Sequence, residues 1–463
     1  MLRRLFQSNR SALPAFQFWG LVATLFGLFL MGGSSRSDVQ SLAILNPFII
    51  LCCGVALATL KKEHWRNRKW IGVSLLAAIF LVAIYNIPMP VSFPNISQGS
   101  IEAAGIREAA SISAGSYAMA ISPSAALQSL TFLASPVAVG LFAIQLKKDD
   151  LMRTLPLIAL IGAISGIVGV LQLAGSSNGL LYLYSITNNG YAVGLFANRN
   201  HGAVFLACLF PILALIVAKT YRSDGDGKSI VLAVSIAVAV ILIPLILVTG
   251  SRSGVLSATV GLVGGVLLYV SHIPRRSDLS SNMSTVPIFT TIVVMCLVFA
   301  TMYFSRAEAI DRIFNRIPTA DVRPEFWTAS LDLFWKYFPL GFGPGSFVAA
   351  FQYDEPFTLI GGTYLNTLHN DWMETGLTFG VIGVILMLTG LIYFIARTFK
   401  LWARLDGRRS AVALSRMASV IIVILAMASI TDYPLRTPAL MAFAALVVVW
   451  FSTTGDEDLK IML

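Results

Sequence analysis

The chain has 463 residues, of which 56% are hydrophobic and 12% charged, and its formal net charge is +10. This composition excludes an ordinary soluble globular domain, in which about a quarter of the residues are charged. It predicts an all-α polytopic membrane protein forming a single integral membrane domain over residues 1–463, because stretches long enough to cross about 30 Å of hydrocarbon recur along the sequence.

Length, punctuation and polar gaps define about twelve candidate transmembrane helices. They lie near residues 15–33, 41–60, 70–88, 127–146, 154–173, 200–218, 229–248, 254–271, 286–305, 376–396, 411–430 and 437–452. The charged leader MLRRLFQSNR precedes an apolar stretch long enough to remain as an anchor, so we expect no cleavable signal peptide. The four cysteines fall inside apolar segments and are interpreted as core residues.

The basic residues predict the orientation. With both termini in the cytoplasm, 23 of the 33 basic residues fall in inner loops, so most of the positive charge orients the protein and does not indicate nucleic-acid binding. Ten basic residues face outward without a role in topology. They are Arg36, Arg107, Arg199, Arg252, Arg306, Arg312, Arg316, Arg323, Lys336 and Arg436.

The longest outer gap, residues 306–375 between the ninth and tenth segments, is predicted to be a helical lid on the outer membrane surface. Its stretch RPEFWTASLDLFWKYF has apolar residues at helical spacing and stops at Pro339. The following GFGPGSF is predicted to be a turn that lets backbone approach a ligand. A second outer gap, 89–126, is rich in small residues. It is predicted to be a flexible loop or a marginal re-entrant piece, and we assign it no chemistry.

Compact polar motifs mark the outer ends of several segments. They are NRNH with Arg199, GSRSG with Arg252, RPEFW with Arg323, HNDWMETGL with His369, Asn370, Asp371 and Glu374, and TDYPLR with Asp432 and Arg436. Each has a structural alternative. Asp371 and Glu374 fit a helix capping box, Asp432 and Arg436 fit a local ion pair, and His201 fits a backbone partner at the start of the sixth segment.

These motifs together predict a site for a lipid diphosphate. Arginine forks bind phosphate oxygens in a bidentate way and stabilise a diphosphate leaving group. We assign diphosphate binding to Arg199, Arg252, Arg323 and Arg436, and general-base catalysis to His369, whose side-chain type titrates near neutrality. Asn370, Asp371, Glu374 and Asp432 are predicted to support His369, although a neighbouring carboxylate remains an alternative base.

At this point the motifs resemble a known family. TGSRSG, HNDWMETGLTFGVIG, the preceding PLGFGPGSF and the upstream NRNH resemble the motif set of the bacterial O-antigen ligase and polymerase superfamily over roughly residues 195–440. The resemblance implies a C-type glycosyltransferase fold in the bacterial inner membrane, with a periplasmic active site that binds undecaprenyl-diphosphate-linked oligosaccharide and a glycan or lipid-linked acceptor. It implies transfer with inversion and with neither metal nor cofactor. Arg252 is similar to the family's diphosphate-binding arginine, and His369 to its proposed base.

Three alternatives accompany this interpretation. We favour a polymerase of an exported polysaccharide, and an O-antigen ligase acting on lipid A–core or another end acceptor is the first alternative. A transporter of lipid-linked glycan is the second, but it predicts charges deep inside the apolar segments. A cytoplasmic nucleotide-sugar transferase is the third. Its only support is the DGD stretch at Asp224–Asp226, which is interpreted as a solvated loop.

Overall fold

The computed structural model describes residues 16–90, 98–111, 116–177, 179–221, 228–272, 323–360, 364–403 and 409–454. Its elements are α2 (Phe16–Met31), α3 (Leu42–Ala58), α4 (Lys62–Asn67), α5 (Lys69–Ile84), β1 (Pro88–Pro90), α6 (Gln98–Ala109), β2 (Ser116–Ala118), α7 (Pro123–Ile144), α8 (Lys148–Ala174), α9 (Arg199–Ala207), α10 (Leu209–Tyr221), α11 (Lys228–Val248), α12 (Arg252–His272), α15 (Arg323–Tyr337), α16 (Phe347–Tyr353), α17 (Asp371–Ala403), α18 (Ser410–Thr431), the 3₁₀ turn η3 (Pro434–Arg436) and α19 (Pro438–Phe451).

The described part of the chain is a helical membrane protein. Seven of its helical stretches are long and apolar enough to cross a membrane, and α2, α3, α5 and α19 are shorter apolar helices. Eleven of the twelve predicted segments coincide with these helices. The predicted ninth segment, 286–305, and residues 306–322 of the predicted lid lie outside the described residues. The all-α, multi-pass architecture is therefore confirmed, whereas the count of twelve spans stays a prediction.

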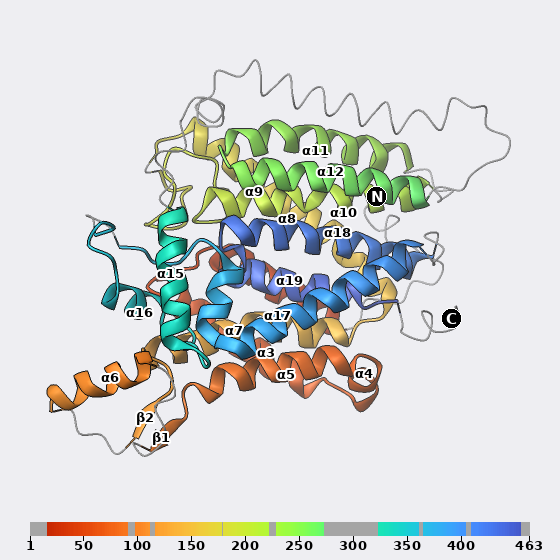
Figure 1. Ribbon diagram of the computed structural model, residues 1–463. Helices are drawn as coiled ribbons and strands as arrows, with labels where there is room; N and C mark the ends of the chain where they lie inside the picture. Colours follow the sequence, from red (N-terminus) through yellow and green to blue (C-terminus); the bar gives the residue numbers. More distant parts are fainter. Residues whose placement is uncertain are drawn as a thin grey trace.

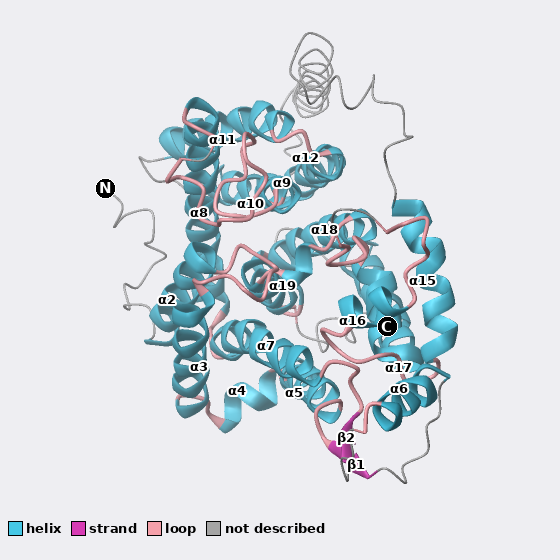
Figure 2. Ribbon diagram, turned by 90° about the vertical axis from the view of Figure 1, so that its left-hand side faces the viewer, coloured by secondary structure: helices cyan, strands magenta, loops and turns pink. Residues whose placement is uncertain are grey.

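The helices of the bundle run side by side, and α15 crosses their ends (Figure 1). The same end carries α16, α6 and the antiparallel pair β1–β2, whereas α4 lies at the opposite end. Seen along the bundle, α18 and α19 occupy the interior between α7 on one side and the group of α9, α10 and α12 on the other (Figure 2). The turn that joins α18 to α19 at the α15 end therefore connects two helices of the interior.

The interior helix α19 anchors this core. Phe443 and Trp450 on α19 are fully buried. The Trp450 indole Nε1 donates a hydrogen bond of 3.2 Å to Oγ1 of Thr154 on α8. A buried indole N–H needs such a partner, and the bond fixes α19 against α8 as well as against α7.

Two segments differ from their predicted form. The 89–126 gap, predicted to be a flexible loop or a re-entrant piece, carries the end of β1, α6 and β2 among its described residues. Lys336 at the end of α15 joins them to the lid region, because its Nζ lies 2.5 Å from Glu102 on α6 and 2.7 Å from Asp354 after α16. The predicted 200–218 helix is interrupted at Cys208, three residues before Pro211, which lacks the N–H that a continuous helix would use.

The glycine-rich turn after α15 packs against α17, not against an open ligand site. Gly380 interrupts α17 with φ 56° and ψ −138°, which removes regular hydrogen bonds from the preceding turn. The turn replaces them: Phe342 N and Gly343 N donate to the carbonyls of Leu377 and Thr378, at 3.2 and 3.0 Å. Val381 N in turn donates to the carbonyl of Pro339 at 2.9 Å. The break thus separates a short outer piece of α17 from its apolar span.

Replacing Gly380 with alanine is expected to destabilise the protein. A Cβ there would lie 1.9 Å from the carbonyl oxygen of Pro339, and the positive φ would add about 1–3 kcal/mol of backbone strain. The measurement is the thermal-unfolding midpoint in detergent. Gly390→Ala on the same helix is the matched control, because no atom lies within 4 Å of a Cβ there. An equal midpoint for the two variants would contradict the tertiary origin of the break.

Candidate active site

Three segments that are distant in sequence meet at η3. The helices α9 and α17 both pack against η3, which itself lies in the turn between α18 and α19. Polar side chains begin each helix: the Asn198 Oδ1 accepts from Asn200 N at 2.9 Å, and the Asn370 Oδ1 accepts from Met373 N at 3.0 Å. Such N-caps fix where the following side chains emerge. The sequence-predicted residues His369 and Asp432 are brought together in this way.

The loop that carries His369 is pinned on both sides. Leu368 N donates to Oε2 of Glu374 at 3.0 Å, and the carbonyl of Leu368 accepts from the Trp327 indole of α15 at 3.0 Å. His369 itself has φ 56°, a left-handed conformation that histidine adopts more readily than most residues but that still carries strain. The surrounding contacts hold this conformation, and they connect α15 directly to the predicted base.

A buried carboxylate faces two imidazoles. The Oδ1 atom of Asp432 lies 3.4 Å from Nδ1 of His369 and 3.7 Å from Nε2 of His201. The side chains of Asp432 and His201 are only 1% exposed, whereas that of His369 is 26% exposed. The Tyr433 ring packs against both imidazoles in T-shaped contacts. Because His369 turns Nδ1 toward Asp432, Nε2 on the other side of the ring is the atom available to a substrate.

Asp432 is held in its charged form. Burial alone would raise the pKa of Asp432, but the contacts with His201 and His369 outweigh burial and hold that pKa well below its usual range. Asn200 Nδ2 donates to Oδ2, and Tyr433 N donates to Oδ1 at 2.9 Å. Since the folded-state pKa is depressed, the resulting stability is present above the unfolded value of about 3.9 and is lost only as pH falls below it.

A second charged cluster lies beside the first. Arg436 Nε is 3.2 Å from Oδ1 of Asp371, and its Nη2 is 3.3 Å from Oε1 of Glu374. Asp371 also accepts from Ser429 Oγ at 3.0 Å. Both carboxylates are buried, and Arg436 offsets part of their negative charge while it joins α17 to η3.

This cluster corrects three predicted contacts. Arg436 pairs with Asp371 and Glu374, and not with Asp432. Asn370 is the N-cap of α17, so the predicted capping box based on Asp371 is wrong by one residue. The contacts of Asp371 and Glu374 run to Arg436, to Ser429 and to backbone, so the carboxylate that faces His369 is Asp432.

The predicted arginines occupy different positions around these clusters. Arg199 is the first residue of α9, and its guanidinium lies 4.2 Å from the centre of the Tyr191 ring. Arg252 is exposed and begins α12, whose N-cap Ser251 accepts from Gly254 N at 2.9 Å. A Cβ on Gly254 would lie 2.4 Å from that of Ala203, so α12 starts directly against α9. Arg323 is the first residue of α15, and its side chain lies outside the described atoms.

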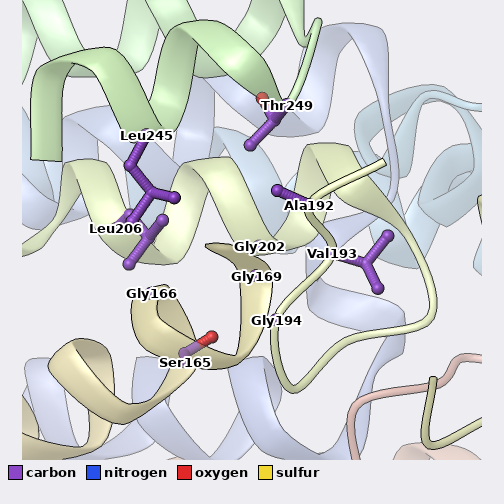
Figure 3. Close-up of a pocket in the computed structure, with 10 residues that line it drawn as sticks. All are labelled: Ser165, Gly166, Gly169, Ala192, Val193, Gly194, Gly202, Leu206, Leu245 and Thr249. Atoms are coloured by element: carbon purple, nitrogen blue, oxygen red, sulfur yellow. The ribbon is translucent and has the colours of Figure 1, made fainter. Parts of the chain in front are cut away.

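The start of α9 is positioned by α8. The Gln172 Oε1 accepts from Val193 N and Gly194 N, at 3.0 and 2.9 Å, and thereby holds the loop that leads to Asn198. A small crevice between α8, this loop, α9 and the end of α11 is lined mainly by glycines and aliphatic side chains (Figure 3). Gly194 is required there, because its φ is 63° and a Cβ would lie 2.3 Å from Ser165 Oγ. The crevice is therefore a packing feature that supports the site.

Two residues of the site were not assigned by sequence reasoning. His201 was interpreted equally well as a backbone partner, and Tyr433 was not singled out. Burial, followed by the neighbouring charge of Asp432, raises the pKa of Tyr433 to about 12, so its hydroxyl keeps its proton at neutral pH. The available signal was the position of Tyr433 directly after Asp432 in TDYPLR. Among the described residues, no group of three or more His, Cys, Asp or Glu is arranged to hold a metal ion.

The fold and this cluster define a multi-pass membrane protein with a histidine–carboxylate site at one end of its helical bundle. Residues 237–388 match the family described as O-antigen ligase, which confirms the predicted resemblance to the O-antigen ligase and polymerase superfamily. The match supports a glycosyltransferase-type enzyme of polysaccharide biosynthesis. It includes Arg252 and His369 but ends before Asp432 and Arg436, and it is shorter than the predicted 195–440 region. The search of curated proteins found no match to this chain.

Proposed function

We propose that this protein transfers a glycan from undecaprenyl diphosphate to an acceptor sugar at the periplasmic face of the bacterial inner membrane, as a polymerase of a surface polysaccharide. The observation that carries the proposal is the orientation of His369. A buried carboxylate behind Nδ1 and a partly exposed ring are the arrangement that general-base catalysis requires. The family match to O-antigen ligase supports the glycan as the group transferred.

In the proposed reaction, Nε2 of His369 accepts the proton of an acceptor hydroxyl. The hydroxyl oxygen attacks the anomeric carbon of the donor glycan and forms the new glycosidic bond, while the bond from that carbon to the diphosphate oxygen breaks. The electron pair leaves with undecaprenyl diphosphate, and attack opposite the leaving group inverts the anomeric centre. Arg252 binds the diphosphate and stabilises its increasing charge, with Arg199 and Arg323 as further candidates. No metal takes part in this scheme.

Arg436 has a different position in this proposal from the other arginines. Its guanidinium already contacts two buried carboxylates, so its charge is balanced before a substrate binds. We therefore propose that it mainly holds the α17 and η3 segments together. Its side chain is 28% exposed, so the predicted contact with the diphosphate would have to use that exposed part.

The alternative within the same chemistry is an O-antigen ligase, which uses lipid A–core or another end acceptor. An in vitro assay separates the two. Purified protein is given undecaprenyl-diphosphate oligosaccharide from its host in the presence of a chelator, with and without a separate acceptor, beside the His369→Ala variant. Lengthened products without added acceptor are expected for a polymerase. Products that require the acceptor would establish a ligase.

The same experiment tests the assignment of the base and the absence of a metal. Equal product from the His369→Ala variant would remove His369 from the mechanism, and loss of product in chelator would contradict the metal-free scheme. If no donor is converted, a flux assay in liposomes becomes decisive. Movement of lipid-linked glycan across the bilayer without any change in the glycan would favour a transporter.

A further inference from the structure

His201 is a buried imidazole that the proposed reaction does not use. It lies on the first turn of α9 with 1% of its side chain exposed, so it cannot meet a substrate directly. Neither of its ring nitrogens makes a hydrogen bond within the described residues. Buried polar atoms without a partner cost free energy, and a native structure keeps them only where something compensates. The carboxylate of Asp432 lies 3.7 Å from Nε2 of this ring.

The two imidazoles share a single oxygen of Asp432. Oδ1 faces Nδ1 of His369 and Nε2 of His201, and it also accepts from Tyr433 N. The other oxygen, Oδ2, accepts from Asn200 on the same turn as His201. The two residues of α9 therefore approach the two oxygens of the carboxylate from one side, while His369 approaches from the loop before α17.

We infer that His201 is a positioning residue, which presents Nε2–H to Asp432 and so fixes the carboxylate that orients His369. Without this contact, Asp432 would keep Asn200 on one oxygen but could rotate its other oxygen away from the His369 ring. His369 would then lose its preference for carrying the proton on Nδ1, and Nε2 would be a free acceptor for only part of the time. The inference rests on the proposed function only for its kinetic consequence.

The Tyr433 ring contacts both His369 and His201. Its centre lies 4.7 Å from that of His369 at an interplanar angle of 71°, and 5.0 Å from that of His201 at 85°. One aromatic ring thus packs against both imidazoles, and the residue just before it supplies the carboxylate that faces both. A change at His201 is transmitted to His369 through this short unit.

The test uses the small number of histidines. The chain has four, so the full-length protein labelled with ¹⁵N-histidine gives few signals, which single substitutions assign. His201→Gln places an amide N–H near the position of Nε2, whereas His201→Leu keeps the bulk and removes the donor. We expect His369 to show one tautomer, with the proton on Nδ1, in the wild type and in His201→Gln. In His201→Leu we expect a mixture of tautomers.

The kinetic arm measures glycan transfer in the same proteins. In His201→Leu, kcat is expected to fall roughly ten- to hundredfold, the effect seen when the hydrogen-bond partner of a metal-ligating histidine is removed. The KM for the lipid donor should not change, and the thermal midpoint should match that of His201→Gln. Asp432→Asn, with His201 intact, should disturb the His369 tautomer in the same way and provides the test if His201→Leu does not fold.

Two results would overturn the inference. A single Nδ1–H tautomer of His369 in His201→Leu would show that Asp432 needs no help from His201. If the Gln and Leu variants both showed the same mixture of His369 tautomers and the same fall in kcat, the shape of the His201 ring would matter and its N–H would not. Because the tautomer is read without any turnover, this inference can fail while the proposed transfer activity stands, and the reverse also holds.

Discussion

Replacing His369 with alanine is expected to lower the rate of glycan transfer by about 10²–10⁴-fold, the usual contribution of a positioned general base. The physical reason is that the His369 side chain is 26% exposed whereas Asp432 behind its Nδ1 is 1% exposed, so His369 is the member of the pair that a substrate can reach. Asp432→Asn should also lower the rate of glycan transfer, since an amide does not hold the imidazole in one tautomer. The measurement is kcat with the lipid-linked donor in detergent.

The matched control for this pair is His64→Ala. His64 lies on α4, at the opposite end of the bundle from α15, and its partner is the exposed Glu63 (Figure 1). Transfer by the control should equal that of the wild type. An Asp432→Asn variant with full activity, beside an inactive His369→Ala, would show that the imidazole works without its carboxylate.

The fold was largely predictable, because segment length and composition decide where helices cross a membrane. The interruption of α17 was not. Gly380 lies in TGLTFGVIG, whose composition predicts one continuous apolar helix. The contact at the break comes from Pro339, which lies 41 residues earlier in the chain. A long-range backbone contact of this kind has no local signal. The same applies to the GFGPGSF turn. Its glycines indicate a close backbone contact, but they do not indicate that the partner is α17.

The site shows the same division between local and long-range information. Polar motifs at one end of the helices correctly brought His369 and Asp432 into one neighbourhood. Proximity in sequence also pointed to Asp371 and Glu374 as partners of His369, beside Asp432. Asp371 follows His369 by two residues, but it is the first residue of α17 and its carboxylate pairs with Arg436. His369 precedes the helix with a positive φ, so its ring points elsewhere and meets Asp432, 63 residues along the chain.

Replacing Arg252 with alanine is expected to cost about 10²–10³-fold in kcat, the size of effect seen when one donor to a developing negative charge is removed. Arg252 is the first residue of α12, and the free N–H groups of that turn add a positive dipole where the guanidinium sits. The start of α12 packs against α9 at Ala203, two residues from His201. A diphosphate bound by Arg252 would therefore lie on the side of the site formed by α9.

Lysine at this position separates charge from geometry. Arg252→Lys keeps the positive charge but has no planar fork, so it should remain well below the wild type while exceeding Arg252→Ala. Arg36→Lys is the control, because the Arg36 guanidinium is already paired with Asp38, at 2.8 and 2.5 Å. It should transfer glycan at the wild-type rate.

The division of the effect between kcat and KM identifies the role of Arg252. Charge on the diphosphate oxygens increases as the glycosidic bond breaks, so an arginine that stabilises the leaving group affects the transition state more than the bound donor. We therefore expect a large fall in kcat with a modest rise in KM. A rise in KM alone would make Arg252 an anchor for the donor, and a fully active Arg252→Lys would show that a single positive charge is sufficient at the start of α12.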